Sequence, residues 1–182
     1  MNIRAYESDG KMTISGQAIV YDKPSNLVAQ NLREVIVKGA LDNVDLTDLL
    51  LLRQHDSKAV MARVSNGTLD VSNLSTDGTF TATLPDTQAG KDLYEDVKSG
   101  LLPECSFGFL ISPNGCRVDK SVTPNVCYVD RISLVAEISV VAKGAYSDTH
   151  VSVLQRAIDD SDTRDKVIRD RELNLRIRGL KA

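Results

Sequence analysis

The chain of 182 residues contains three side chains whose chemistry together would support acyl transfer: Ser106, His55 and Glu137. Such a reaction needs a hydroxyl nucleophile, an imidazole that takes its proton and an acceptor that holds the imidazole in one tautomer. Each residue alone has an ordinary structural explanation, because serines are common in strands and an isolated histidine or glutamate is more often structural or solvated. The combination indicates a serine hydrolase without a metal or other cofactor.

Ser106 lies in the segment PECSFGF, residues 103–109, which predicts the start of a strand. Alternate side chains of a strand point to opposite faces, so the large apolar residues are expected together on the buried face. Ser106 is then expected on the less crowded face beside Gly108, where another polypeptide can approach it. The buried face would consist of Cys105, Phe107, Phe109 and Ile111.

The other two candidates also belong to predicted strands. The apolar run LLLLRQHD, residues 49–56, predicts a buried strand that brings His55 to a rim. The segment RISLVAEISVVA, residues 131–142, predicts a strand with Glu137 on its wetter face. Its apolar face would consist of Ile132, Leu134, Ala136, Ile138 and Val140.

Two neighbours offer alternative roles. Asp56 follows His55 directly, but adjacent side chains of an extended segment point opposite ways, so a hydrogen bond between them is geometrically awkward. Cys105 is a conceivable nucleophile, but its alternation places it in the core, where a thiol is usually inert.

The remaining pattern indicates an α+β, mainly β domain, which we expect to be a distorted antiparallel barrel with helices outside it. Asp-Gly at 77–78 predicts a hairpin tip between two strands. Asp86-Thr87 predicts the cap of a helix over residues 88–99, with Gly100 as its end and an inward stripe of Ala89, Leu93 and Val97. Residues after the Pro113-Asn114-Gly115 turn are expected to be irregular, and further strands are expected at residues 11–21, 33–37, 60–64, 68–74 and 79–84.

Composition excludes several classes of function. The 22 lysines and arginines against 25 acidic residues give a net charge of −3, which disfavours nucleic acid as a partner. Three unclustered cysteines (Cys105, Cys116, Cys127) and two histidines argue against a metal site and a disulfide framework, and favour a reducing, intracellular setting. No signal-like core is visible at the start and no apolar run could cross a membrane, so we expect no membrane partner.

Four blocks, in this order, resemble the prohead (capsid maturation) serine proteases of tailed bacteriophages, a family related in fold to the herpesvirus assembly proteases. The resemblance runs from about residue 15 to residue 153. The blocks are REVIVKGALDN, RQHDSKAVMARVSNGTLDV, DGTFTATLPDTQAGKDLYEDVKSGLLPECSFGF and LVAEISVVAKGAYSDT.

This resemblance implies that Ser106 is the nucleophile, His55 the general base and Glu137 the third member. It also implies that the enzyme cleaves scaffold, coat protein and often itself inside an immature phage shell in the host cytoplasm, and that it depends on self-association or confinement. The protease domain would span residues 1–158. Residues 159–182, about half of them charged, would form a solvated helix or a tail that is trimmed or docks on scaffold.

The related viral enzymes leave two further points open. They place oxyanion donors in the loop after the third catalytic strand, which corresponds to Lys143, Gly144 and Ala145; this chain has Lys143-Gly144 where the family commonly has a proline before the alanine. The herpesvirus enzymes use a second histidine as third member, which makes His150 the alternative to Glu137.

A non-catalytic assembly module with the same barrel is the competing function, whereas an esterase is disfavoured because no G-x-S-x-G surrounds Ser106.

Overall fold

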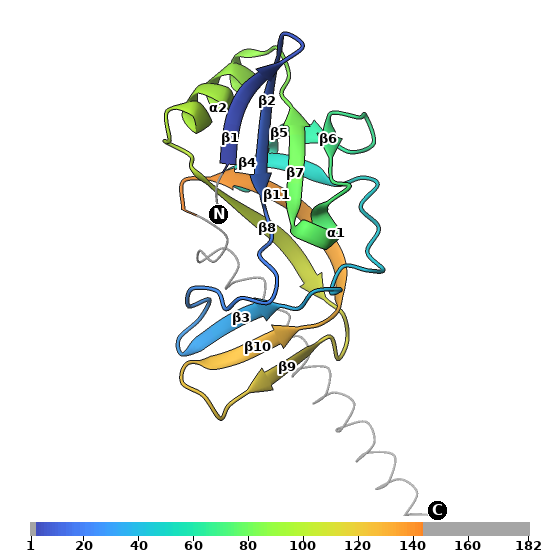
Figure 1. Cartoon of the computed structure of the whole chain (residues 1–182), viewed down its shortest axis with the longest axis vertical. Helices are drawn as coiled ribbons and strands as arrows, with labels where there is room; N and C mark the ends of the chain where they lie inside the picture. The colour runs from blue at the N-terminus through green and yellow to red at the C-terminus, as the bar shows by residue number, and fades with distance from the viewer. Residues whose placement is uncertain (1–2, 144–182) are drawn as a thin grey trace, which may run out of the picture.

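The computed structural model describes residues 3–143, in which eleven strands and two helices are defined (Figure 1). The helices are α1 (Leu74–Asp77) and α2 (Gln88–Lys98). The strands are β1 (Ile3–Ser8), β2 (Lys11–Gln17), β3 (Leu32–Ile36), β4 (Leu50–Arg53), β5 (Asp56–Arg63), β6 (Leu69–Asp70), β7 (Thr79–Thr83), β8 (Glu104–Ile111), β9 (Cys116–Asp119), β10 (Asn125–Val129) and β11 (Ile132–Val141).

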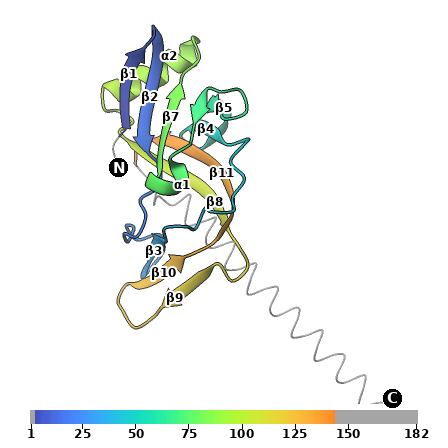
Figure 2. The same ribbon diagram turned by 45° about the vertical axis from the view of Figure 1, so that its right-hand side comes forward.

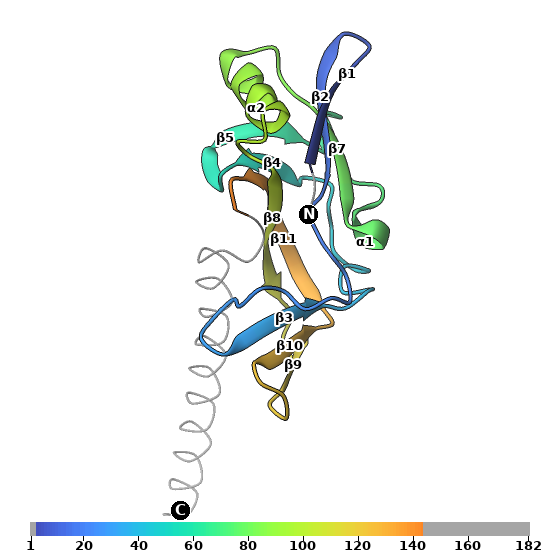
Figure 3. The ribbon, with the colours of Figure 1, turned by 60° about the vertical axis from the view of Figure 1, so that its left-hand side comes forward.

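The strands of the described part form three sheets, with orders β1-β2-β7-β6, β3-β10-β9 and β5-β4-β11-β8. The mainly β class is confirmed, but no sheet of residues 3–143 closes on itself, so the expected barrel is not confirmed. Two pairings, β3 with β10 and β4 with β11, are parallel rather than antiparallel. Figures 1 and 3 show the long strands β8 and β11 running between the sheet that contains β1 and the sheet that contains β3.

Within residues 3–143, a cluster of buried apolar side chains joins the three sheets. It includes Ile14 of β2, Ile138 of β11 and Val129 of β10, each completely buried. Phe107 of β8 is the largest fully buried side chain, and its ring stacks on that of Phe109 at 4.7 Å between centroids. Burial of each such side chain contributes about 1.5–3 kcal/mol, so this core fixes β8 against β11.

Helix α2 confirms the predicted cap and differs in its buried stripe. The Thr87 side chain accepts a hydrogen bond from Gly90 N, and the chain leaves the helix through Gly100 at φ 76°. Ala89 is exposed, so the expected stripe is wrong at its first position, which Gly90 takes instead. The close packing there requires glycine, because a Cβ at Gly90 would lie 2.0 Å from the Pro85 carbonyl oxygen. The buried stripe is Gly90, Leu93, Tyr94 and Val97. Neither helix of residues 3–143 has the length and apolar character needed to cross a membrane.

The predicted hairpin tip at Asp77-Gly78 is instead the end of helix α1. Gly78 takes the left-handed conformation (φ 72°) and its N–H donates to Leu74 O. Its carbonyl accepts from Ala18 N at 2.8 Å, and a Cβ at Gly78 would lie 1.9 Å from Ile19 O. The glycine is therefore required by a close backbone approach, and β6 and β7 pair with a helical turn between them in the chain (Figure 1). Figure 2 shows α1 at the end of β7.

The segment after Gly115, expected to be irregular, contains strands β9 and β10. They pair antiparallel, and Cys116 and Cys127 form a disulfide between them with their Cα atoms 6.3 Å apart. The expectation of no disulfide is therefore wrong for this pair. Spacing of eleven residues gave no signal for it, because register across a hairpin, rather than sequence distance, brings two cysteines together.

Glu34 is a charged residue in the core of the β3-β10-β9 sheet. Its side chain is only 1% exposed, and Oε1 has no hydrogen-bond partner among the described residues. Its backbone N–H donates to Ser25 Oγ at 2.8 Å, which fixes the strand but not the carboxyl group. Burial raises the pKa of Glu34 to about 7, because an ionised carboxylate loses its hydration there.

The buried carboxyl of Glu34 makes stability depend on pH. Since the folded pKa is raised above the unfolded value, its stabilising contribution is fully present below about pH 4.5 and is lost as pH rises through about 7. We expect the contribution of Glu34 to the free energy of unfolding to fall by about 3 kcal/mol between pH 4.5 and pH 8. Urea unfolding at several pH values should show that Glu34→Gln removes most of this slope, whereas the exposed-site control Glu7→Gln keeps it. Equal slopes for Glu34→Gln and the wild type would contradict this account.

Candidate functional site

His55 lies at the tip of the β4-β5 hairpin, in the two-residue turn between Arg53 and Asp56. Both turn residues, Gln54 (φ 55°) and His55 (φ 58°), are in the left-handed region, which matches a type I′ turn. A non-glycine residue there costs about 1–2 kcal/mol, so other contacts must stabilise the turn. The expected position of His55 at the end of a strand is confirmed.

Strand β11 supplies those contacts. Gln54 N donates to Val140 O at 2.9 Å, and His55 N donates to Ser139 Oγ at 3.2 Å. The Gln54 side chain accepts a hydrogen bond from Ala142 N at 3.1 Å. The turn is thereby held on the last residues of β11, although 84 positions separate His55 from Ser139.

The imidazole of His55 faces the carboxylate of Glu137. Nδ1 of His55 lies 2.9 Å from Oε1 of Glu137, and the two side chains are only 18% and 13% exposed. An ionised carboxylate only accepts hydrogen bonds, so Nδ1 carries the proton and Nε2 is the basic nitrogen of this tautomer. Asp56 instead accepts from Lys58 N at 2.9 Å, in agreement with its expected unsuitability as a partner of His55.

Ser106 shares a face of the β8-β11 pair with Glu137. In this antiparallel ladder Ser106 lies opposite Ser139, and Gly108 lies opposite Glu137. Directly opposite residues project to the same side with Cβ atoms about 4.5–5.5 Å apart. Since the Ser139 hydroxyl contacts the His55 backbone, the ladder brings the serine, the histidine turn and the glutamate to one face.

The expected openness of Ser106 is wrong, because its side chain is completely buried. Ser139, which lies opposite Ser106 and accepts a hydrogen bond from His55 N, is also completely buried. Strand alternation predicted the correct face for Ser106 but carried no information about how deeply that face is buried.

The expected apolar face of β11 is also wrong in its first half. Irregularities in register occur between Ile132 and Leu134 and between Val135 and Glu137. They leave Leu134 43% exposed and bury Val135. Each bulge inserts one residue and so reverses the alternation, an effect that is invisible in a hydrophobic pattern.

Gly108 provides the space that the Glu137 carboxylate occupies. A Cβ at Gly108 would lie 2.8 Å from Glu137 Oε1, the oxygen that faces His55. The missing side chain was expected to make room for an approaching polypeptide; in the structure it makes room for the third candidate residue.

The remaining candidates lie at or beyond the end of the described part. Lys143 is exposed in a bend directly after β11, whereas Gly144, Ala145 and His150 fall outside the described residues.

Cys105 is buried as expected, and burial raises the pKa of its thiol to about 12, which makes it a poor nucleophile. Within residues 3–143 no cluster of histidine, cysteine and acidic side chains could hold a metal ion.

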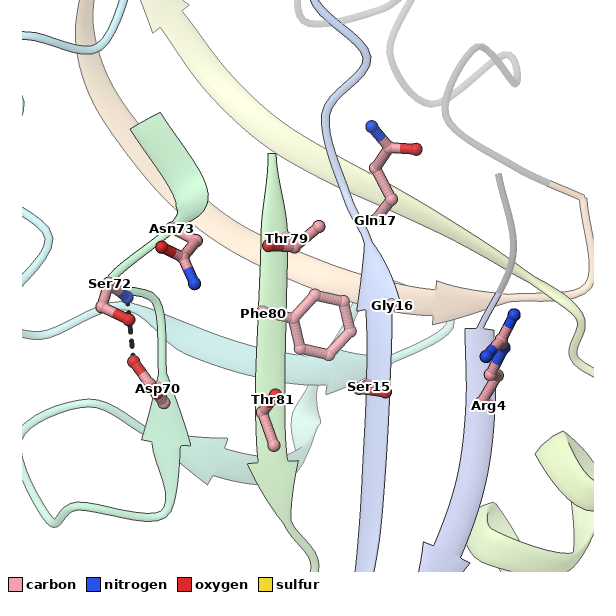
Figure 4. A pocket seen from close by; sticks show the side chains of 10 residues that line it. All are labelled: Arg4, Ser15, Gly16, Gln17, Asp70, Ser72, Asn73, Thr79, Phe80 and Thr81. Carbon is pink, nitrogen blue, oxygen red and sulfur yellow. Dashed lines mark hydrogen bonds between the residues drawn. The ribbon is translucent and has the colours of Figure 1, made fainter. Parts of the chain in front are cut away.

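A cavity of about 310 Å³ lies elsewhere, on the β1-β2-β7-β6 sheet (Figure 4). Arg4, Ser15, Thr81 and Asp70 form one cross-strand row along it, and Ser72 N donates to Asp70 Oδ1 at 2.9 Å. None of the candidate catalytic residues lines this cavity. This cavity is therefore separate from the His55–Glu137 pair.

Gly108→Ala tests whether the glycine holds the carboxylate in place. The added methyl displaces Glu137 Oε1, and the fold should survive because that oxygen ends a flexible side chain. We expect NMR of ¹⁵N-histidine-labelled protein to lose the hydrogen-bonded Nδ1–H signal of His55. Leu110→Ala, an exposed change on the same strand, is the control and should keep the signal. An unchanged signal in Gly108→Ala would refute this role.

Comparison with known proteins places the chain in a protein family. The sequence profile of the caudovirus prohead serine proteases matches residues 1–164 of the 182. No curated protein and no solved structure matches the chain, so the relation to herpesvirus assembly proteases remains a prediction. The match covers most of the chain, including Ser106, His55 and Glu137, and the protein belongs to the caudovirus prohead serine protease family.

Proposed function

We propose that the protein is a serine endopeptidase of phage capsid maturation in which Ser106 is the nucleophile, His55 the general base and Glu137 the third member. The hydrogen bond from His55 Nδ1 to Glu137 Oε1 at 2.9 Å is the observation that carries the proposal. The position of Ser106 opposite Ser139, beside the His55 turn, supports the assignment of the nucleophile.

In this mechanism Nε2 of His55 takes the proton of Ser106 as Oγ attacks the carbonyl carbon of the scissile peptide bond. Glu137 stabilises the imidazolium that forms. The imidazolium then protonates the amine that leaves as the peptide bond breaks, which gives an acyl-enzyme. A water molecule, deprotonated by His55, attacks the ester and releases the new carboxyl end, and the proton returns to Ser106.

The tetrahedral intermediate needs donors for its oxyanion. We propose backbone N–H groups of Lys143, Gly144 and Ala145, which come shortly after β11 in the sequence. The bond from Ala142 N to the Gln54 side chain supports this choice, because it ties the residue before Lys143 to the turn that carries His55. Loss of one oxyanion donor typically lowers turnover about 10²–10³-fold.

Membership of the family points to the procapsid in the host cell as the place of action. We propose scaffold and major coat protein as substrates, self-cleavage as a further reaction, and self-association as a condition of activity. The protease domain would comprise residues 1–158, and the charged residues 159–182 would be the segment trimmed or docked on scaffold.

A protease with a buried Ser106 needs an opening step before catalysis. Its hydroxyl is completely buried, so a peptide substrate must displace neighbouring groups before the attack. We propose that association within the procapsid favours this opening.

Ser106→Ala should abolish cleavage of the coat protein and the scaffold when they are co-expressed with the protease. The substitution removes one oxygen from a buried side chain, so the fold should persist, with little change in melting temperature. Mass spectrometry of the products reports activity and the bond cut. Continued processing by a folded Ser106→Ala variant would disprove the assignment.

Self-association should make specific activity rise with protein concentration. We expect turnover per molecule to increase over the range in which sedimentation shows oligomers, because association favours the open site. A substrate peptide taken from the observed cleavage site serves for the measurement. Turnover that stays constant across that range would rule out this dependence.

The competing function is a non-catalytic assembly module, and the complete burial of Ser106 is the observation that favours it. A serine-reactive fluorophosphonate separates the two functions. Labelling that maps to Ser106 and disappears in His55→Ala supports the protease. Absence of labelling under conditions in which coat protein is processed by the same preparation would contradict the Ser106 mechanism.

A further inference from the structure

Ser139 has two hydrogen bonds that link the predicted base to the predicted acidic residue. Its hydroxyl donates to Glu137 Oε2, and its oxygen accepts from the backbone N–H of His55 at 3.2 Å. The residue is completely buried on β11, opposite Ser106. It lies two positions after Glu137 in the same strand, so its side chain is on the same face as that of Glu137.

The two bonds complete a closed ring. The side chain of His55 reaches Glu137 through Nδ1 and Oε1, and its backbone reaches the same carboxylate through the Ser139 hydroxyl and Oε2. Both carboxylate oxygens are thus assigned, one to the imidazole and one to the serine. This arrangement fixes the carboxylate plane, because rotation would break one bond or the other.

The ring also stabilises an unfavourable backbone. His55 is in the left-handed region, which a β-carbon disfavours, and its N–H bond to Ser139 is one of the contacts that hold the turn against β11. The ring is mostly buried, which strengthens its hydrogen bonds. A change at Ser139 should therefore alter the position of the imidazole as well as the orientation of Glu137.

We propose that Ser139 is a positioning residue of the active site, which orients Glu137 and holds the His55 turn; this role rests on the proposed protease function. Ser139 does not react with the substrate. Its contribution is to keep the Nδ1–H bond formed before substrate arrives, so that Nε2 faces the nucleophile in a fixed direction.

Three variants of Ser139 in the full chain test this role. Ser139→Ala removes the hydroxyl, Ser139→Cys keeps the size with a poor hydrogen-bond donor, and Ser139→Thr retains a hydroxyl. Ser133→Ala is the matched control, since Ser133 is an exposed serine of β11 whose hydroxyl donates to Leu110 O at 3.1 Å. The chain has only two histidines, so His150→Gln, introduced into the NMR samples alone and not into the proteins assayed for kcat, leaves His55 as the single source of imidazole signals.

We expect Ser139→Ala and Ser139→Cys to weaken or abolish the Nδ1–H signal of His55 and to lower kcat about 10²-fold, with KM little changed. Ser139→Thr should restore much of both, and Ser133→Ala should behave as the wild type. The cysteine variant keeps the test valid if the alanine variant is unstable.

An unchanged Nδ1–H signal together with wild-type kcat in a folded Ser139→Ala or Ser139→Cys variant would overturn the proposal. A loss of kcat that Ser139→Thr shares, with the signal retained in all variants, would also overturn it, since the effect would then follow the packing of the side chain and not its hydroxyl. The NMR readout needs no substrate. Failure of Ser106 as nucleophile would appear in the cleavage assay, and failure of the Ser139 role in the His55 spectrum.

Discussion

The hydrogen bond between His55 and Glu137 joins two segments that are 82 positions apart, and the surrounding structure is arranged to permit it. The histidine is brought by a hairpin turn with a costly backbone conformation, and the glutamate by a strand with a bulge immediately before it. On the neighbouring strand Gly108 leaves space for the carboxylate. Each of these features is unfavourable or neutral for the fold alone, which is typical of functional sites.

Partial burial makes this pair sensitive to loss of either member. The two side chains are less than one-fifth exposed, so removal of the imidazole would leave a carboxylate with reduced hydration and without its partner. Breaking a buried pair in this way costs about 3–5 kcal/mol at full burial and less here, where some solvent reaches both groups. Stability and positioning therefore come from the same contacts, and substitutions at His55 or Glu137 must be assayed for folding as well as activity.

Local patterns predicted the elements that carry the site. Alternation in PECSFGF predicted β8 and its buried face, and Thr87 with Gly100 predicted the ends of α2. The same alternation placed Ser106 and Glu137 on the face where they are found. These successes share a cause, because strand and helix periods depend on burial of one face, which the composition of each segment records.

Features that depend on contacts between distant segments were not predictable in this way. The bulges of β11, the disulfide between Cys116 and Cys127, and the burial of Ser106 arise from strand register and tertiary packing. The contacts of Ser139 with Glu137 and His55, on which its proposed role rests, belong to the same class. An Asp-Gly pair was misread as a hairpin tip because its left-handed glycine equally suits the end of a helix.

A crystal structure of the full chain after reaction with a fluorophosphonate would test the central claim most directly. The account predicts phosphorus bonded to Ser106 Oγ, with Nε2 of His55 within hydrogen-bond distance of the adduct and Nδ1 still bonded to Glu137. An adduct on another residue, or an adduct on Ser106 with the imidazole turned away and Glu137 bonded elsewhere, would contradict it.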